Sequence, residues 1–201
     1  VSVAMVLTGR MSAKRLPTYI AGQFLGSLLG ALTVYGIYGS SIAQYEAKKN
    51  IVRGTFESVT TAKMFGEYYN QPGGYTISMP LAIAVEALGT FLLVLIIFLF
   101  TKGANVGRPN DNTAPILIGL TVGSLLVLLA SITQAGMNPT RDFAPRLVAW
   151  MFGWGNAAFP DSSGGFFWVY ILAPLVGGVL AGYFFTKVLE PAMKKQSELN
   201  K

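Results

Sequence analysis

Residues 136–146 read GMNPTRDFAPR, and this stretch decides how the rest of the chain is interpreted. It comes at the end of an uncharged run, residues 113–140, which is long enough to lie within a membrane. Asn138 is a preferred N-cap, and Pro139 suits the first helical position because its missing N–H would have no partner there. The sequence therefore predicts a helix that begins at Asn138, inside or beside the membrane, with Arg141 in its first turn.

The composition indicates a membrane protein. Of the 201 residues, 52% are hydrophobic and 12% are charged, whereas soluble domains carry about 25% charged residues. The net charge is +6, but the basic residues lie singly or in pairs between apolar runs, a pattern of membrane topology, so we expect no nucleic-acid partner. Because Cys and His are absent, disulfides, most zinc sites and most catalytic triads are excluded, and we expect neither an enzyme nor a cofactor or metal.

Four windows are long enough to cross a bilayer as helices, which takes about 20 apolar residues. They are residues 16–38, 79–101, 114–133 and 166–186, and Glu86 is the one charged residue inside them. Two shorter apolar segments, residues 1–9 and 139–153, are predicted to be half-helices, which are tolerated at membrane depth where protein or a water-filled path surrounds them.

The basic flanks of the spans predict the orientation. The cytoplasmic side is expected to carry the C-terminus and the following basic residues: Arg10, Lys14, Arg15, Lys102, Arg108, Lys187, Lys194, Lys195 and Lys201. Small residues repeat every four positions and predict faces on which helices pack closely: Gly22, Gly26 and Gly30, Gly119 with Gly123, and Gly178 with Gly182.

The order of the segments suggests an internal repeat. A half-helix followed by a full span occurs at residues 1–38 and again at residues 139–186. Two spans precede the second copy and none precedes the first. An inverted repeat of two spans, a half-helix and a span explains this order if the first copy lacks its first two spans. We therefore expect residues 1–201 to be a single but incomplete membrane channel domain.

The central stretch has two interpretations. Two half-helices entering from opposite faces would bring their positive N-terminal ends together at the midplane. Asn138 would then offer N–H donors to a hydroxyl or a water, the unwound carbonyls of Gln134, Ala135 and Gly136 would offer acceptors, and Arg141 would reject cations. A neutral hydrogen-bonding solute could exchange partners along such a line.

The alternative is an amphipathic helix on the membrane surface. In that case Asn138-Pro139 is simply a cap, Arg141 and Arg146 face lipid headgroups, and Asp142 pairs with a neighbouring arginine. The pattern alone leaves both interpretations open.

Glu86 also has two possible roles, because a carboxylate inside a span is a functional hypothesis in itself. It could relay protons or bind a cation, or it could accept backbone N–H bonds from the unwound loop before Asn138. No span holds a second acid or a His, so we favour the role as a structural support.

The stretch NPTRDFAPR, residues 138–146, resembles the second signature box of the aquaporin family (major intrinsic proteins), which usually reads Asn-Pro-Ala-Arg. AVEALGT, residues 84–90, resembles the glutamate-bearing inner helix of that family, and residues 1–9 resemble the half-helix that follows the first Asn-Pro-Ala box. The resemblance implies an all-α inverted-repeat bundle, represented here by four full transmembrane helices and two half-helices, without the first box and the first two helices.

Within the family the chain resembles the bacterial glycerol facilitators, on five positions: Tyr38 at the outer end of the third helix, Asp142, Arg146, Pro174 and Leu175. This likeness implies a passive channel for glycerol and other small neutral solutes, with water, embedded as a homotetramer in the lipid bilayer of the plasma membrane, here a bacterial inner membrane. Asn138 would lie at the midpoint and Arg141 in the outer constriction. A water-selective aquaporin and an ion-coupled secondary transporter using Glu86 and Arg141 are the alternatives.

Three positions depart from the usual pattern. Thr140 replaces the usual Ala, Leu126 stands where a small residue or His commonly helps to form the constriction, and Ala135 stands where facilitators carry an aromatic residue. These departures leave the width of the passage and the preferred solute open.

Overall fold

The computed structural model describes residues 1–101, 105–159 and 164–199, and every regular element in these ranges is helical. The α-helices are α1 (Ser2–Leu7), α2 (Leu16–Lys49), α3 (Val59–Ala62), α4 (Met79–Thr101), α5 (Thr113–Thr133), α6 (Pro139–Ala149), α7 (Ala173–Phe184) and α8 (Glu190–Leu199). Short 3₁₀ or π-helical turns are η1 (Ala13–Arg15), η2 (Phe56–Ser58), η3 (Trp150–Trp154), η4 (Gly155–Ala158), η5 (Phe167–Leu172) and η6 (Phe185–Leu189).

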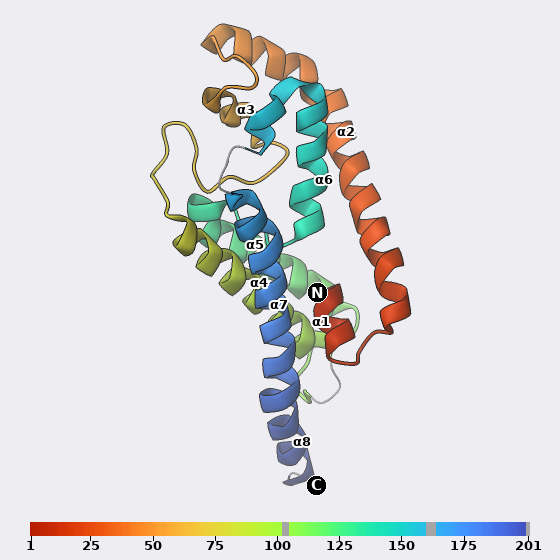
Figure 1. Cartoon of the computed structure of the whole chain (residues 1–201). Helices are drawn as coiled ribbons and strands as arrows, with labels where there is room; N and C mark the ends of the chain where they lie inside the picture. Colours follow the sequence, from red (N-terminus) through yellow and green to blue (C-terminus); the bar gives the residue numbers. More distant parts are fainter. Residues whose placement is uncertain (102–104, 160–163, 200–201) are drawn as a thin grey trace.

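The predicted all-α membrane architecture is confirmed. In the described ranges, four helical stretches are long and apolar enough to cross a membrane: Ala13–Lys49, Met79–Thr101, Thr113–Thr133 and Phe167–Leu199. The two predicted half-helices are present as α1 and α6, and Figure 1 shows the start of α6 close to α1. Lys102 and Lys201, which the predicted orientation uses, lie outside the described residues.

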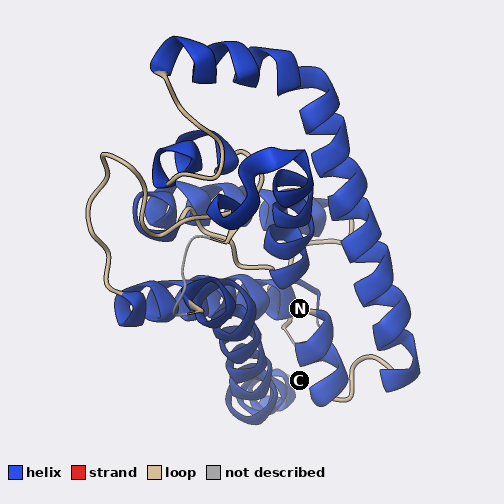
Figure 2. Ribbon diagram, turned by 45° about the horizontal axis from the view of Figure 1, so that its top comes forward, coloured by secondary structure: helices blue, strands red, loops and turns tan. Residues whose placement is uncertain are grey.

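The helix of the first predicted span extends beyond the apolar window that ends at Tyr38. Helix α2 continues to Lys49 and ends there because Asn50 adopts a left-handed conformation with φ 54°. Loss of hydrophobicity marks the edge of the membrane but does not stop a helix that lacks a breaker. Figures 1 and 2 show the last turns of α2 bending across the top of the molecule, and residues 39–41, Gly-Ser-Ser, are of the kind found at such bends.

The last span is also longer than predicted, and it is not a uniform α-helix. It runs from η5 through α7 and η6 into α8, ending at Leu199. Pro174 has no N–H to donate to the carbonyl of Tyr170, so the α-helical pattern is interrupted at this point. The widened π-helical turn η5 precedes the proline, as is usual where the ladder is broken.

Helices α4 and α7 pack closely because α7 carries glycines at their contact. A Cβ atom on Gly177 would lie 2.0 Å from the carbonyl oxygen of Ala87, so only glycine fits there. Gly178 lies opposite Thr90, and Gly182 faces Ala4 of α1. The predicted packing role is therefore seen at two of the seven glycines; in the described ranges no atom would lie within 4 Å of a Cβ at the others, which are Gly22, Gly26, Gly30, Gly119 and Gly123.

Two apolar clusters hold the half-helices in place. Near α1, buried Ala4 packs with Val94 and Phe98 of α4 and with Ala181 and Phe185 of the last span. Around α6, a second cluster joins α2, α3 and the residues that follow α6; its members include Ala31, Ile42, Val59, Val148 and Trp154. Each half-helix is thus surrounded by protein on its buried side, which is the condition for irregular backbone at membrane depth.

Candidate functional site

The chain unwinds between α5 and α6. Gln134, Ala135 and Met137 have φ values of 62°, 58° and 50°, in the left-handed region that non-glycine residues rarely adopt. Such a conformation costs free energy and persists only where the surroundings impose it. The contacts around this loop must therefore hold it in this conformation.

Glu86 of α4 holds the loop. Its side chain is fully buried, and its carboxylate oxygens accept the backbone N–H groups of Gly136 at 2.9 Å and Met137 at 2.7 Å. Gly136 is packed so tightly that an added Cβ atom would lie 2.9 Å from the ring of Tyr170. The Tyr170 hydroxyl donates to the carbonyl of Thr133 at the end of α5. A buried carboxylate that satisfies two loop donors is the supporting arrangement favoured from the sequence.

Asn138 caps the N-terminus of α6. Its backbone is extended, and its Oδ1 atom accepts the backbone N–H of Thr140 at 3.2 Å and the Thr140 hydroxyl at 2.9 Å. The hydroxyl that departs from the usual pattern therefore adds a second bond to the cap. Because Oδ1 is engaged with the helix, the Nδ2 group of Asn138 is left to donate elsewhere.

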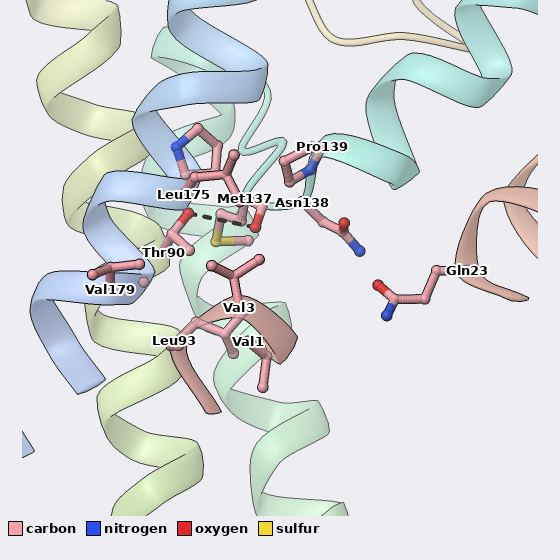
Figure 3. Close-up of a pocket in the computed structure, with 13 residues that line it drawn as sticks. Val1, Val3, Gln23, Thr90, Leu93, Met137, Asn138, Pro139, Leu175 and Val179 are labelled. Atoms are coloured by element: carbon pink, nitrogen blue, oxygen red, sulfur yellow. Dashed lines mark hydrogen bonds between the residues drawn. The ribbon is translucent and has the colours of Figure 1, made fainter. Parts of the chain in front are cut away.

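A cavity of about 100 Å³ lies beside Asn138. Its polar side chains belong to Asn138, Gln23 of α2 and Thr90 of α4, and Figure 3 shows the amides of Asn138 and Gln23 facing each other. The opposite wall is apolar and includes Pro174 and Leu175 of α7. Val1, the N-cap of α1, and Val3 in its first turn also border the cavity, so it lies between the starts of the two half-helices.

This arrangement suits a small neutral molecule that carries hydroxyl groups on a hydrocarbon skeleton. The amides offer hydrogen bonds on one side, and the apolar wall contacts carbon on the other. A cation would meet the positive end of α6 and no carboxylate among the lining residues.

Arg141, in the first turn of α6, is paired with an acid. Its guanidinium forms an ion pair with the carboxylate of Glu67, a residue between α3 and α4. The Glu67 side chain is 7% exposed and that of Arg141 is 44% exposed, so the arginine reaches solvent while its partner lies beneath it. Sequence reasoning missed Glu67 because it stands in a long loop with no local motif.

Asp142 and Arg146 form a buried pair behind Arg141. Arg146 Nε donates to Asp142 at 2.7 Å, and its other nitrogens donate to the carbonyls of Ala158 and Glu67. The backbone N–H of Glu67 in turn donates to Asp142 at 2.7 Å. Asp142 has no exposed surface, so it serves this network and does not line the cavity.

Tyr68 joins the segment between α3 and α4 to the loop before α6. Its backbone N–H donates to the side-chain oxygen of Gln134 at 2.8 Å, so the Gln134 amide is engaged with protein. Burial raises the pKa of Tyr68 to about 12, and the protonated hydroxyl donates to the carbonyl of Ala157 at 3.0 Å.

The structure brings together only part of the predicted site. Asn138, Pro139, Pro174 and Leu175 line the cavity. Ala135 is 1% exposed and packs with Leu125 and Met137, against which Leu126 also lies. Tyr38 lies elsewhere, in a groove of about 360 Å³ between α2 and α3. Gln23 was missed, although an amide within an apolar span is a signal of a polar contact.

The unwound loop, the supporting glutamate and the paired half-helices correspond to the family suggested by the residues. Residues 1–185 match the family model of the major intrinsic protein, which is most of the chain. The chain belongs to the major intrinsic protein family.

Curated relatives within the major intrinsic protein family are similar over nearly the whole chain. Human aquaporin-9 is 36% identical over 94% of this chain, and the glycerol uptake facilitator protein of Escherichia coli K12 is 34% identical over 94%. The chain spans 61% and 66% of the length of these two relatives. Among solved structures, the aquaglyceroporin from Plasmodium falciparum matches with a TM-score of 0.80 at 25% identity, covering 96% of this chain and 72% of that one.

Proposed function

We propose that the protein is a passive membrane channel for glycerol and other small neutral solutes, with water. The observation that carries the proposal is the cavity beside Asn138, where amide groups face an apolar wall at the start of a half-helix. The names of the relatives, a glycerol uptake facilitator and aquaporin-9, support the same solute class.

Each group has a proposed task in conduction. Asn138 donates through Nδ2 to a solute hydroxyl, while Leu175 and Pro174 contact the carbon skeleton. Arg141, paired with Glu67, is proposed to form the outer constriction. The positive N-terminal end of the α6 dipole and the positive charge of Arg141 repel cations. Glu86 keeps the loop, and therefore Asn138, in place.

The setting of the channel is part of the proposal. Apolar side chains exposed on α2, α4 and α5, among them Leu29, Leu88 and Val127, suit contact with lipid or with another copy of the chain. We propose a plasma membrane location, a bacterial inner membrane where the source is bacterial, with the C-terminus in the cytoplasm, and a homotetramer. Crosslinking in native membranes tests the tetramer, and accessibility of a tag after Leu199 to membrane-impermeant reagents tests the orientation.

The experiment uses the gene product that contains this chain, reconstituted in liposomes. After a hyperosmotic step with glycerol, light scattering should show reswelling faster than in empty liposomes, with no saturation and no dependence on a proton gradient. Asn138→Asp should slow the reswelling, because the carboxylate removes the two N–H donors and attracts cations. The matched control is Asn112→Asp, which makes the same change at an exposed residue just before α5. This variant should conduct glycerol normally.

The alternatives have distinct outcomes in the same assay. Water permeability without glycerol permeability would show a water-selective aquaporin. Saturable, pH-dependent uptake that is lost in Glu86→Gln would show an ion-coupled transporter. Either result would overturn the proposal.

A further inference from the structure

The C-terminal end of α6 is bound by a ring of polar side chains far from the cavity. Arg53 donates from Nε to Glu46 at 2.8 Å and from Nη1 to the carbonyl of Phe152 at 2.6 Å. The second oxygen of Glu46 accepts the Thr61 hydroxyl at 2.6 Å, and Thr61 accepts the indole N–H of Trp154 at 3.0 Å. The ring closes because the guanidinium of Arg53 lies 3.8 Å from the Trp154 ring centroid.

The ring caps a helix end. Helical geometry is lost at Phe152 and Gly153, where φ is −96° and +100°, so the last carbonyls of the half-helix lack intrahelical partners. A cation that donates to such a carbonyl also offsets the negative end of the helix dipole. Burial alone lowers the pKa of Arg53, but its hydrogen bonds with Tyr35 and Glu46 raise it above the ordinary value, so the charge is retained.

The segment that carries Arg53 and Thr61 also reaches the first turn of α6. From Thr61 the chain continues within a few residues to Glu67, which pairs with Arg141 and donates its N–H to Asp142. A Cβ atom on Gly66 would lie 2.5 Å from the Arg146 side chain, so the backbone is pressed against α6 there. Residues 53–68 are therefore attached to α6 at its first turn and at its end.

We propose that residues 53–68 act as a clasp on α6. The four residues of the ring, Glu46, Arg53, Thr61 and Trp154, keep this clasp closed and are therefore positioning residues for Arg141. The inference rests on the proposed function for its effect on solutes. When the ring is opened, the clasp loosens, Glu67 shifts with it, and Arg141 is no longer held at one place beside the passage. The permeability to larger polyols then rises relative to the permeability to glycerol, because the width of the constriction is no longer fixed.

The test compares Thr61→Val with Thr61→Ser. Valine keeps the shape and removes the hydroxyl that joins Glu46 to Trp154, whereas serine keeps the hydroxyl. In liposomes, Thr61→Val and Arg53→Gln should raise the ratio of ribitol to glycerol permeability by about threefold, the size expected for loss of a coupling through packed contacts. Thr61→Ser should retain the original ratio, and so should Arg108→Gln, whose partner Asp111 is 88% exposed.

A second measurement does not depend on conduction. Amide hydrogen exchange in detergent should speed up in residues 64–71 of Thr61→Val and stay unchanged in α8. If all solutes slow by one common factor, or if exchange in residues 64–71 is unaltered, the ring only stabilises the fold and the inference is wrong. If the unsubstituted protein passes no glycerol, the proposed function fails, while the exchange data still decide whether the clasp exists.

Discussion

At the scale of single residues, the ionisable groups around α6 are each matched to a specific partner. A carboxylate such as Glu86 is costly in apolar surroundings unless hydrogen bonds satisfy it. Here it accepts two N–H groups from a loop whose left-handed residues would otherwise relax. The loop donors therefore satisfy the buried carboxylate, and the carboxylate holds the loop in its strained conformation, which accounts for an acid within the α4 span.

Glu86→Gln should weaken this support. The amide places N–H₂ against a backbone N–H, so one loop donor stays unsatisfied, at a cost of about 1–3 kcal/mol in stability. Thermal unfolding in detergent should show a lower Tm, and glycerol flux in liposomes should fall because Asn138 is less well held. Glu198→Gln, at an exposed position in α8, is the control. Wild-type Tm and flux in Glu86→Gln would contradict the supporting role.

Glu67→Gln should change selectivity more than stability. The ion pair with Arg141 is partly exposed, so its loss costs less than that of a buried pair. The released guanidinium no longer fixes the width of the constriction, which favours a polyol more than water. We expect the ratio of glycerol to water permeability to rise, measured by reswelling and by osmotic shrinkage of the same liposomes. An unchanged ratio would mean that Arg141 lies outside the passage.

At the scale of elements, the contact between α4 and α7 sets the width of the bundle behind the cavity. Pro174 and Leu175 reach the cavity from α7, and Thr90 reaches it from α4. The two helices approach this closely because Gly177 lies against the backbone of Ala87. The position of the cavity wall thus depends on a residue with no side chain.

Gly177→Ala should therefore separate these helices. The added methyl group would overlap a backbone carbonyl that cannot rotate away, and overpacking of this kind costs about 1–3 kcal/mol. Gly22→Ala and Gly119→Ala are matched controls in α2 and α5, because a Cβ atom there meets nothing within 4 Å in the described ranges. Unfolding by heat in detergent should show a lower Tm for Gly177→Ala alone. Equal Tm values for all three variants would contradict the contact.

The sequence predicts elements well where one local signal is sufficient. Hydrophobic length locates α4 and α5, and the Asn138-Pro139 cap locates the start of α6. The end of α2 lies beyond the predicted span because hydropathy reports the membrane boundary and not the helix boundary. Glu67 was missed because its pairing with Arg141 joins residues far apart in sequence, and such long-range contacts leave no local pattern.

At the scale of the whole molecule, the two half-helices and the spans around them place one small cavity between the starts of α1 and α6 (Figure 3). Figure 1 shows α3 and the bent end of α2 on one side of this level, and the α1–α2 connection and the C-terminus on the other. A route across the membrane through the cavity would therefore pass the first turn of α6, where Arg141 and Glu67 lie.

A cysteine test locates that route. The 201 residues contain no Cys, so a single substitution in this part of the protein creates a unique thiol there. Leu175→Cys places the thiol on the cavity wall, whereas Leu180→Cys places it on the same helix at a position that is 56% exposed on the outer surface. The ionised thiol, which forms only where water is present, attacks the sulfur of a methanethiosulfonate and displaces methanesulfinate. A small water-soluble methanethiosulfonate should therefore modify Leu175→Cys and block glycerol flux, and excess glycerol should slow the block.

Leu180→Cys should react slowly, because an outer face that meets lipid offers no water, and its glycerol flux should persist. The unsubstituted protein is treated in parallel to account for any thiol elsewhere in the gene product, and mass spectrometry reports the extent of modification at each position. Full modification of Leu175→Cys without loss of flux would show that solute does not pass beside α7. Equal block of both variants would place water on both faces of α7, which a helix lining one narrow passage within a membrane cannot have.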